Sequence, residues 1–225
     1  MVNQDKYRSY NGARIDLFKL ANFDFSDKTI LDVGCYQGAN ARYLKDKYKN
    51  ITYIGLEGDS EAILNVYSEV DKIYQIDLDY IDFSILDEVD IDFIILGDII
   101  EHLKEPDIFM PRLAKIINDN TQLIVSIPNI QYYETFLQLL FGNFPRRDRG
   151  IFDKTHLHWF TNKEFRKMVK NDYEIISFSR SFRLVDGNCC ASLNQYSKYF
   201  MPLFYLFPPF FTYQLKYVLK QKQKK

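Results

Sequence analysis

The chain has 225 residues, of which 47% are hydrophobic and 26% charged, with a formal net charge of -1. A chain of this length can bury one substantial core, so we expect a single domain over residues 1–225. The balanced charge provides no basic field that would attract a polyanion, and we therefore expect no nucleic-acid partner.

The cysteines and the first residues of the chain indicate its compartment. Cys35, Cys189 and Cys190 do not have the spacing of metal ligands, so we predict no metal site. Such thiols are typical of a reduced compartment. Residues 1–8 contain an early acid, Asp5, and no apolar core, which argues against a secretory signal. We expect a cytoplasmic protein without a transmembrane segment.

Apolar runs typical of strands alternate with helical patterns along the chain. This alternation predicts an α/β fold with a mainly parallel sheet covered by helices on both faces. Between residues 130 and 162 the alternation lapses, and an insertion at such a place covers the site at the carboxyl ends of the strands. The expected strands are 29–33, 52–56, 72–76, 93–96, 122–126, 174–180 and 213–219, and the expected helices are 13–20, 39–48, 108–117 and one from residue 163.

The first strand leads into a glycine-bearing turn at residues 32–38. Gly34 and Gly38 lack a Cβ, so the backbone can turn sharply and lie against a ligand. Amides at the start of the following helix favour a carboxylate or a phosphate. Tyr36 replaces the middle glycine of a dinucleotide fingerprint, which argues against a tight phosphate-binding turn. The pattern predicts a nucleotide-type cofactor site.

Two later strands end in acids. Glu57 follows the turn by about twenty residues, where a carboxylate accepts hydrogen bonds from both ribose hydroxyls. A further apolar run ends in Asp98 and continues through Glu101 and His102. Because the carboxyl ends of parallel strands meet at one edge of a sheet, Glu57 and Asp98 are expected to converge on one ligand.

These stretches resemble the class I S-adenosylmethionine-dependent methyltransferases, which have Asp-Val-Gly-Cys-x-x-Gly after the first strand, an acid after the second, and Asp-x-x-x-His or Glu-His-Leu after the fourth. Residues 150–161 resemble the Leu-Asp-x-Thr-His-Leu-Arg-Phe-Phe-Thr signature of a branch associated with bacterial surface polysaccharide (capsule) assembly. Phe152 replaces the leucine and His158 the arginine. The similarity extends from about Arg14 to Tyr217.

The resemblance implies a Rossmann-like, doubly wound, mainly parallel seven-stranded sheet with an antiparallel last strand and an inserted acceptor-binding lid at 130–162. It also implies S-adenosylmethionine as the cofactor. Leu78 and Asp77 would lie near the adenine, although Asp77 also fits a solvated acidic loop, and Arg14 would reach the methionine carboxylate or remain a surface arginine. The implied cofactor residues are Arg14, Asp32, Gly34, Cys35, Gly38, Glu57, Asp77, Leu78 and Asp98.

His156 and His102 are the candidate catalytic bases, because imidazole transfers protons near neutral pH. Asp153, close to His156 in sequence, could orient its ring. His158 lies two residues further on, and in an extended segment its side chain points away from that of His156. For His102, a structural role in packing or capping is the competing interpretation.

The lid also carries residues suited to an acceptor. Arginines bind anions in a fork geometry, and aromatic rings stack on sugars. The competing interpretations are a solvated basic loop and an aromatic lid core. The candidate substrate-binding residues are Tyr132, Tyr133, Arg146, Arg147, Arg149, His158 and Trp159.

An aromatic segment, residues 199–211, precedes the last expected strand. It is too short and too interrupted by proline to span a bilayer, which takes about 20 apolar residues. We prefer a buried connection or a homodimer surface; peripheral contact with a membrane is the alternative.

The resemblance implies methyl transfer to an oxygen, and less readily to a nitrogen, of a cell-surface glycan precursor or its substituent. One alternative is a quinone or another small aromatic acceptor. A second alternative is a catalytically inactive cofactor-binding protein that regulates a partner.

Overall fold

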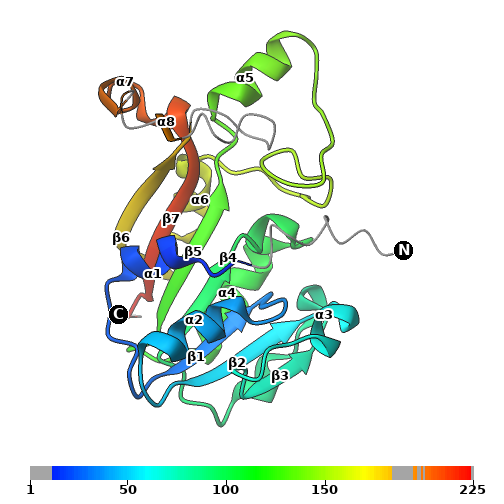
Figure 1. Cartoon of the computed structure of the whole chain (residues 1–225), viewed down its shortest axis with the longest axis vertical. Coiled ribbons are helices and arrows are strands. Elements are labelled where there is room, and N and C mark those ends of the chain that lie inside the picture. The colour runs from blue at the N-terminus through cyan, green and yellow to red at the C-terminus, as the bar shows by residue number, and fades with distance from the viewer. Residues whose placement is uncertain (1–11, 184–194, 197–198, 200, 224–225) are drawn as a thin grey trace.

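The computed structural model describes residues 12–183, 195–196, 199 and 201–223. Cys189 and Cys190 lie outside the described residues. Seven strands form one sheet in the order β3-β2-β1-β4-β5-β7-β6 (Figure 1). The strands are β1 Thr29–Val33, β2 Thr52–Glu57, β3 Lys72–Gln75, β4 Phe93–Gly97, β5 Gln122–Pro128, β6 Tyr173–Phe182 and β7 Thr212–Gln221.

The pairing matches the expected fold class. Strands β1 to β5 pair in parallel, and β7 is antiparallel to both β5 and β6. The helices are α1 Ile15–Ala21, α2 Ala39–Lys47, α3 Ser60–Leu64, α4 Pro106–Ile116, α5 Tyr133–Leu140, α6 Asn162–Val169, α7 Met201–Leu206 and α8 Pro208–Phe211, with short 3-10 turns η1 Leu78–Tyr80, η2 Phe83–Leu86 and η3 Ile100–His102.

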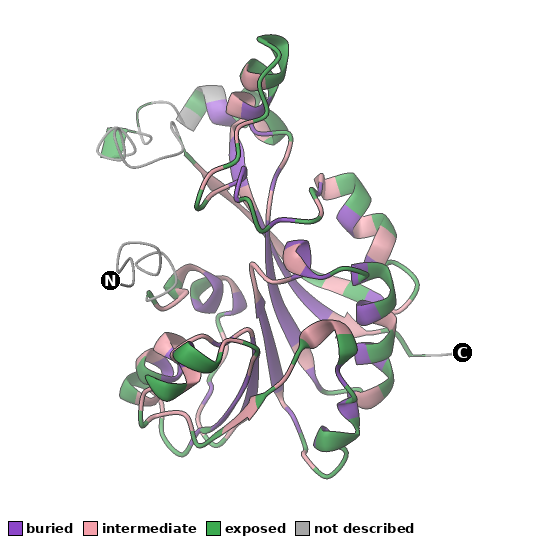
Figure 2. Cartoon of the chain, turned by 90° about the vertical axis from the view of Figure 1, so that its right-hand side faces the viewer, coloured by how far each residue is buried: buried purple, intermediate pink, exposed green. Residues whose placement is uncertain are grey.

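The core lies on both faces of the sheet. In β1, Ile30 packs into one apolar cluster with α1 and α2, whereas Leu31 packs into the other with α4. Figure 2 shows the buried residues concentrated in the central strands, with exposed residues on the outer helices. Because central parallel strands are covered on both faces, they are apolar at nearly every position. This arrangement brings the carboxyl ends of β1, β2, β4 and β5 to one edge.

The lid expected at 130–162 lies beyond the carboxyl end of β5. It consists of α5 and a long loop that returns to the sheet through a bridge between Asn129 and Phe160. In Figure 1, α5 lies beside α8, and ring contacts of Phe210 with Tyr133 and Phe136 join the two helices. The insertion is therefore a packed unit connected to the end of the sheet.

The aromatic segment 199–211 only partly matches the expected buried connection. Phe204 is buried against Phe182 and Phe211. Tyr205 and Leu206 are exposed, however, so burial is the wrong interpretation for them, and a contact surface fits this part of α7 better. Within the described ranges, no helix combines the length and apolarity needed to cross a membrane.

Candidate functional site

The turn after β1 has the backbone shape that its glycines predict. Gly34 and Gly38 have φ values of 72° and 83°, in the left-handed region. A Cβ on Gly34 would lie 2.6 Å from Cδ1 of Ile99, which belongs to the chain after β4. The turn therefore needs a glycine at position 34 both for its backbone conformation and for its close packing against the neighbouring strand end.

The amides of this turn donate to the protein itself. Gly34 and Cys35 both donate to the carbonyl of Leu56, and Tyr36 donates to Oε2 of Glu57 at 2.7 Å. These three amides lie before α2, and the expectation that the amides at the start of α2 bind an anion stays a prediction. The hydrogen bonds from these three amides hold the turn in a fixed position against the end of β2.

Glu57 is held as a rigid acceptor at the end of β2. In addition to Tyr36, the amides of Gly58 and Asp59 donate to Oε1 at 2.8 Å and 2.9 Å. Three amide donors fix the direction of this side chain. Oε2 has one donor, and since each carboxylate oxygen accepts about two hydrogen bonds, it keeps room for a ribose hydroxyl.

The side chains of Asp32 and Cys35 are buried behind the turn, and neither is accessible to a cofactor. Asp32 is 2% exposed, and its Oδ2 accepts hydrogen bonds from Tyr53 and from Asn40. Burial raises the pKa of Asp32 to about 6, against the opposite effect of those two donors. Cys35 is also buried, which raises the pKa of its thiol. Burial turns these two side chains away from a cofactor, and the assignment of both residues to the cofactor site stays a prediction.

Arg14 and Asp98 are joined in a network between the start of the chain and the end of β4. Nη1 of Arg14 lies 2.5 Å from Oδ2 of Asp98, and its five N–H groups donate to Asp98, Ser126, Gln214 and, twice, Asp16. Burial opposes the charge, but Asp98 and then Asp16 outweigh it and raise the pKa of Arg14 above its ordinary value. Contact with the methionine carboxylate stays a prediction, and it would require Arg14 to release one of these bonds.

The chain after β3 leaves both interpretations of Asp77 open. Asp77 is exposed, and its side chain caps η1 by accepting from the amide of Asp79 at 3.0 Å. Leu78 is half-buried against the larger core cluster. Contact of Leu78 and Asp77 with adenine stays a prediction.

Glu101, to which we assigned no role from sequence, is the most unusual group at this edge. It is 1% exposed, and both of its carboxyl oxygens are without a hydrogen-bond partner. Burial, and after it the charge of Asp98, raises the pKa of Glu101 well above its usual range. A buried carboxyl without partners is costly, so its presence needs an explanation.

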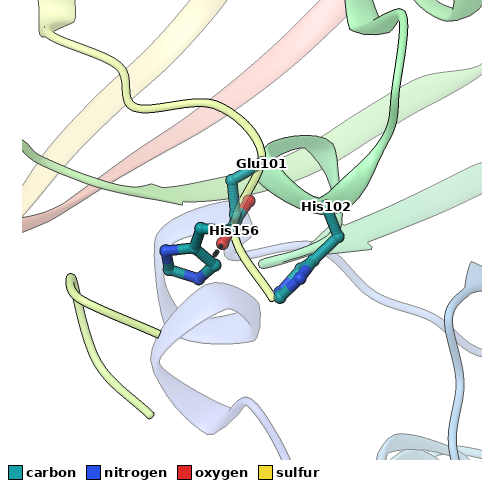
Figure 3. A group of neighbouring side chains, drawn as sticks. All are labelled: Glu101, His102 and His156. Carbon is teal, nitrogen blue, oxygen red and sulfur yellow. Dashed lines mark ion pairs between the residues drawn. The ribbon is translucent and has the colours of Figure 1, made fainter. Parts of the chain in front are cut away.

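His156 and His102 lie beside Glu101 (Figure 3). Nε2 of His156 is 3.9 Å from Oε1 of Glu101, and the two imidazole centroids are 4.7 Å apart. Nδ1 of His156 contacts the carbonyl of Ile151, and Nδ1 of His102 contacts the carbonyl of Thr155, both at 3.2 Å. Burial, with the nearby His102 ring, lowers the pKa of His156, so its ring is neutral near pH 7.

The lid segment that carries His156 is fastened to η3. The amides of Leu157 and His158 both donate to the carbonyl of Glu101, at 2.9 Å and 3.1 Å. His158 points elsewhere, as expected, with Nε2 3.0 Å from the carbonyl of Lys104. Oδ1 of Asp153 accepts from the amide and hydroxyl of Thr155. The carbonyl of Ile151 contacts Nδ1 of the His156 ring, and orientation of this ring by Asp153 stays a prediction.

Two of the predicted substrate-binding side chains are engaged within the lid. Tyr132 is 0% exposed and packs against Tyr133 and Tyr213, so a stacking contact between Tyr132 and an acceptor is a wrong prediction. Arg147 forms an ion pair with Glu134 at 2.7 Å and lies over the ring of Phe152. Its guanidinium is thus directed into the lid.

The other predicted acceptor residues are more accessible. Arg146 and Arg149 are exposed, although Arg146 donates to the carbonyl of Lys154. Trp159 is 38% exposed and packs edge-on against Phe144. Tyr133 is half-buried between Tyr132 and Phe210. Acceptor binding by these residues and by His158 stays a prediction.

Sequence reasoning missed several residues that organise the site. Gln214 donates to both oxygens of Asp98 from β7, and Ser126 donates to Oδ1 of Asp98 from β5. Asn40 links the backbone of Arg14 to Asp32. These residues carry no local motif, and only the pairing of distant strands brings them together. Glu101 did have a local signal, its place in the Glu-His-Leu stretch.

The chain is similar to known methyltransferases in sequence and in fold. A family model described as a methyltransferase domain matches residues 6–177. (S)-Tetrahydroprotoberberine N-methyltransferase of Eschscholzia californica is 29% identical over 102 residues, 44% of this chain and 29% of that enzyme. N-methyltransferase 4 of Papaver somniferum is 26% identical over 102 residues, covering 43% of this chain and 29% of that enzyme. The chain thus spans less than a third of the length of these plant relatives.

Solved structures share the fold. A SAM-dependent methyltransferase from Archaeoglobus fulgidus superposes with a TM-score of 0.63 at 14% identity, covering 99% of this chain and 100% of the other. Magnesium protoporphyrin IX methyltransferase from Synechocystis PCC 6803, solved with bound SAH, gives a TM-score of 0.61 at 15% identity, covering 99% and 88%. The chain belongs to the methyltransferase-domain family, and it shares the fold of a SAM-dependent methyltransferase.

Proposed function

We propose that the chain transfers the methyl group of S-adenosylmethionine to an oxygen of a small acceptor that binds beside η3, under the lid. The observation that carries this proposal is the cluster of Glu101, His102 and His156 at the edge where β1, β2 and β4 end. The cluster joins the end of β4 to the inserted lid, so groups from both sides can act on one acceptor atom.

The residues of the first two strand ends suit the cofactor. The positive-φ turn at Gly34 and Gly38 presents backbone without side chains, and Glu57 presents a fixed carboxylate with room on Oε2. Such a turn and acid are the features that bind the nucleoside part of a cofactor in folds of this type. S-adenosylmethionine supplies a methyl group on a positively charged sulfur.

The cluster beside η3 has groups that can handle the acceptor proton. Methyl transfer breaks the methyl–sulfur bond and forms a methyl–oxygen bond, while the hydroxyl proton leaves the acceptor. With Nδ1 facing a carbonyl, Nε2 of neutral His156 carries a lone pair that can receive a proton. In this proposal the chain positions the acceptor in line with the methyl group and removes its proton.

For the acceptor itself we propose a glycan precursor or its charged substituent. This is supported by the resemblance of residues 150–161 to the polysaccharide-associated branch and by the exposed Arg146 and Arg149 on the lid. A nitrogen or aromatic acceptor is the second candidate. It is favoured by the exposed Trp159 beside Phe144 and by the N-methyltransferase names of the plant relatives.

The test is formation of S-adenosylhomocysteine from S-adenosylmethionine in the presence of candidate acceptors. The panel contains nucleotide-linked and phosphorylated sugars, neutral glycans, quinols and tertiary amines. Turnover with a hydroxyl acceptor supports the proposal, and preference for phosphorylated sugars supports the glycan assignment. Turnover only with amines would contradict the oxygen assignment. Cofactor binding without turnover on any acceptor would favour the inactive regulatory alternative.

A further inference from the structure

Three groups that commonly bind metal ions face one another at the junction of η3 and the lid. One ligand atom from each of Glu101, His102 and His156 lies within 4.8 Å of the others. Figure 3 shows Glu101 and His102 on the turn after β4, and His156 on the lid loop that crosses it. The cluster therefore combines two imidazoles and one carboxylate from two separate segments of the chain.

The hydrogen bonds of the two rings determine which ring nitrogens are available. A backbone carbonyl can only accept a hydrogen bond, so Nδ1 of His156, facing Ile151, and Nδ1 of His102, facing Thr155, must each carry a proton. In the neutral form of each ring, Nε2 then carries a lone pair. For His156 this lone pair belongs to the atom that lies 3.9 Å from Oε1 of Glu101.

Nothing on the described chain supplies a hydrogen-bond donor to the carboxyl group between these rings. Glu101 is 1% exposed, and neither of its oxygens has a hydrogen-bond partner. The distance of 3.9 Å from His156 is too long for a hydrogen bond. A buried carboxyl group that lacks a donor and lies beside imidazole lone pairs is unfavourable, and a cation bound by all three groups would offset that cost.

We propose that Glu101, His102 and His156 bind one divalent transition-metal ion, with Zn²⁺ the best match. Two histidines and one glutamate form a ligand set of catalytic Zn²⁺ sites, which keep a further position open. Imidazole nitrogen favours such ions over Mg²⁺ and Ca²⁺. In a tetrahedral site, ligand atoms about 2.1 Å from the ion lie about 3.4 Å from one another. The 3.9 Å between Nε2 of His156 and Oε1 of Glu101 then has to close by about 0.5 Å, and a separation at the 4.8 Å limit by about 1.4 Å, so metal binding draws the three side chains closer together.

The surroundings hold the three ligands as metal sites require. In such sites a ligating histidine donates its other N–H to a carbonyl or carboxylate, which fixes the ring. The carbonyls of Ile151 and Thr155 provide this support here. The amides of Leu157 and His158 fasten the lid to the carbonyl of Glu101, so the two halves of the site are joined next to the ligands.

What the ion does rests on the proposed function. An ion with an open position binds the acceptor hydroxyl and lowers its pKa. The proton then passes to water or buffer, the methyl–sulfur bond breaks and the methyl–oxygen bond forms. His102 and His156 would act as ligands instead of as the base. The sequence-based expectation of no metal site considered cysteine spacing, and this cluster contains no cysteine.

The test measures binding of the metal alone to the full chain, without tag or acceptor. After chelation and dialysis, Co²⁺ is titrated and followed by its visible absorption, and Zn²⁺ content is measured by mass spectrometry after dialysis. We expect one ion per chain, and Glu101→Gln, His102→Gln and His156→Gln each to weaken binding at least tenfold. His158→Gln is the matched control, because Nε2 of His158 already faces the carbonyl of Lys104; it should bind like the wild type.

Folding of the variants is checked separately. Glu101→Gln removes an unpartnered buried carboxyl, so the metal-free variant should melt at or above the temperature of the metal-free wild type. Zn²⁺ should then raise the melting temperature of the wild type and leave that of Glu101→Gln nearly unchanged. The metal proposal would be overturned if the wild type did not bind one ion per chain, or if the three ligand variants bound the metal as tightly as the wild type.

Failure of the metal proposal and failure of the proposed function give different results. Methyl transfer that persists after chelation, without metal binding, overturns the metal site and leaves the proposed function standing. One-to-one metal binding without turnover on any acceptor supports the site and overturns the function.

Discussion

Arg14 and Asp98 lie 84 residues apart in the sequence, and their side chains meet at 2.5 Å over the end of β4. The pair joins the segment before α1 to the strand edge where the cofactor site is built. Asn40, which accepts from the backbone amide of Arg14 and donates to Asp32, extends the connection to the end of β1. The turn after β1 and the end of β4 are thus held together by one polar network.

Loss of Arg14 should destabilise the fold. Arg14→Ala leaves Asp98 with Ser126 and Gln214 but without its cation, and we expect a loss of about 2 kcal/mol in the free energy of unfolding. Urea unfolding of the variant and the wild type measures this loss. Lys28→Ala, which breaks the more exposed pair with Asp92, is the control and should cost less than about 1 kcal/mol. Equal effects of the two variants would refute a special role for Arg14.

Asp32 should make stability depend on pH. Its pKa in the folded chain is about 6, above the usual 3.8, so the folded state holds this proton more tightly than the unfolded state. Its contribution is therefore fully present below about pH 4 and is lost as pH rises through about 6. Asp32→Asn has no carboxyl group to titrate at this position, so it does not lose stability in this way as the pH rises. Its stability relative to wild type should rise between about pH 4 and 7, by on the order of 2 kcal/mol.

Urea unfolding of both proteins over this pH range provides the measurement. A stability difference between them that stays constant with pH would contradict the assignment of a raised pKa to Asp32.

The strands were predicted closely because their signal is local. The predicted strand 29–33 matches β1, and the predicted strands 93–96 and 122–126 each end within two residues of β4 and β5. Central strands buried on both faces produce continuous apolar runs that end at charged or glycine positions. The acids at the strand ends, Glu57 and Asp98, were found for the same reason.

The lid was harder to predict, because its contacts join distant segments. Composition could not distinguish the buried Tyr132 from the exposed Trp159, since both belong to an aromatic-rich segment. The partners of Asp98 include Gln214, 116 residues away. Glu101 had a local signal in the Glu-His-Leu stretch, but its closeness to His156 depends on a lid loop that follows more than 50 residues later and is hydrogen-bonded to its carbonyl.

The histidine cluster should affect turnover more than cofactor binding. His156→Gln should lower kcat about 100-fold or more, whether His156 acts as a base or as a ligand, while the affinity for S-adenosylhomocysteine stays near the wild-type value. Steady-state kinetics and calorimetry measure the two quantities. A fall in cofactor affinity that matches the fall in kcat would place His156 at the cofactor instead.

The exposed arginines provide a test of the acceptor. Arg146→Ala combined with Arg149→Ala should raise the KM for a phosphorylated acceptor about tenfold, because a charged hydrogen bond contributes on the order of 1.5 to 3 kcal/mol. Arg147→Ala should act differently, since its pair with Glu134 holds the lid, and it should mainly lower the melting temperature. An unchanged KM in the double variant would exclude anion recognition by these two residues.

The most direct test of the central claim, a cofactor site between the turn after β1 and the end of β2, is calorimetric titration with S-adenosylhomocysteine. We expect a Kd in the micromolar range, about 7 to 8 kcal/mol of binding free energy. Glu57→Ala should weaken binding tenfold or more, because it removes the fixed carboxylate that Tyr36, Gly58 and Asp59 hold in place. A wild type that does not bind, or an equal Kd for Glu57→Ala, would contradict the account.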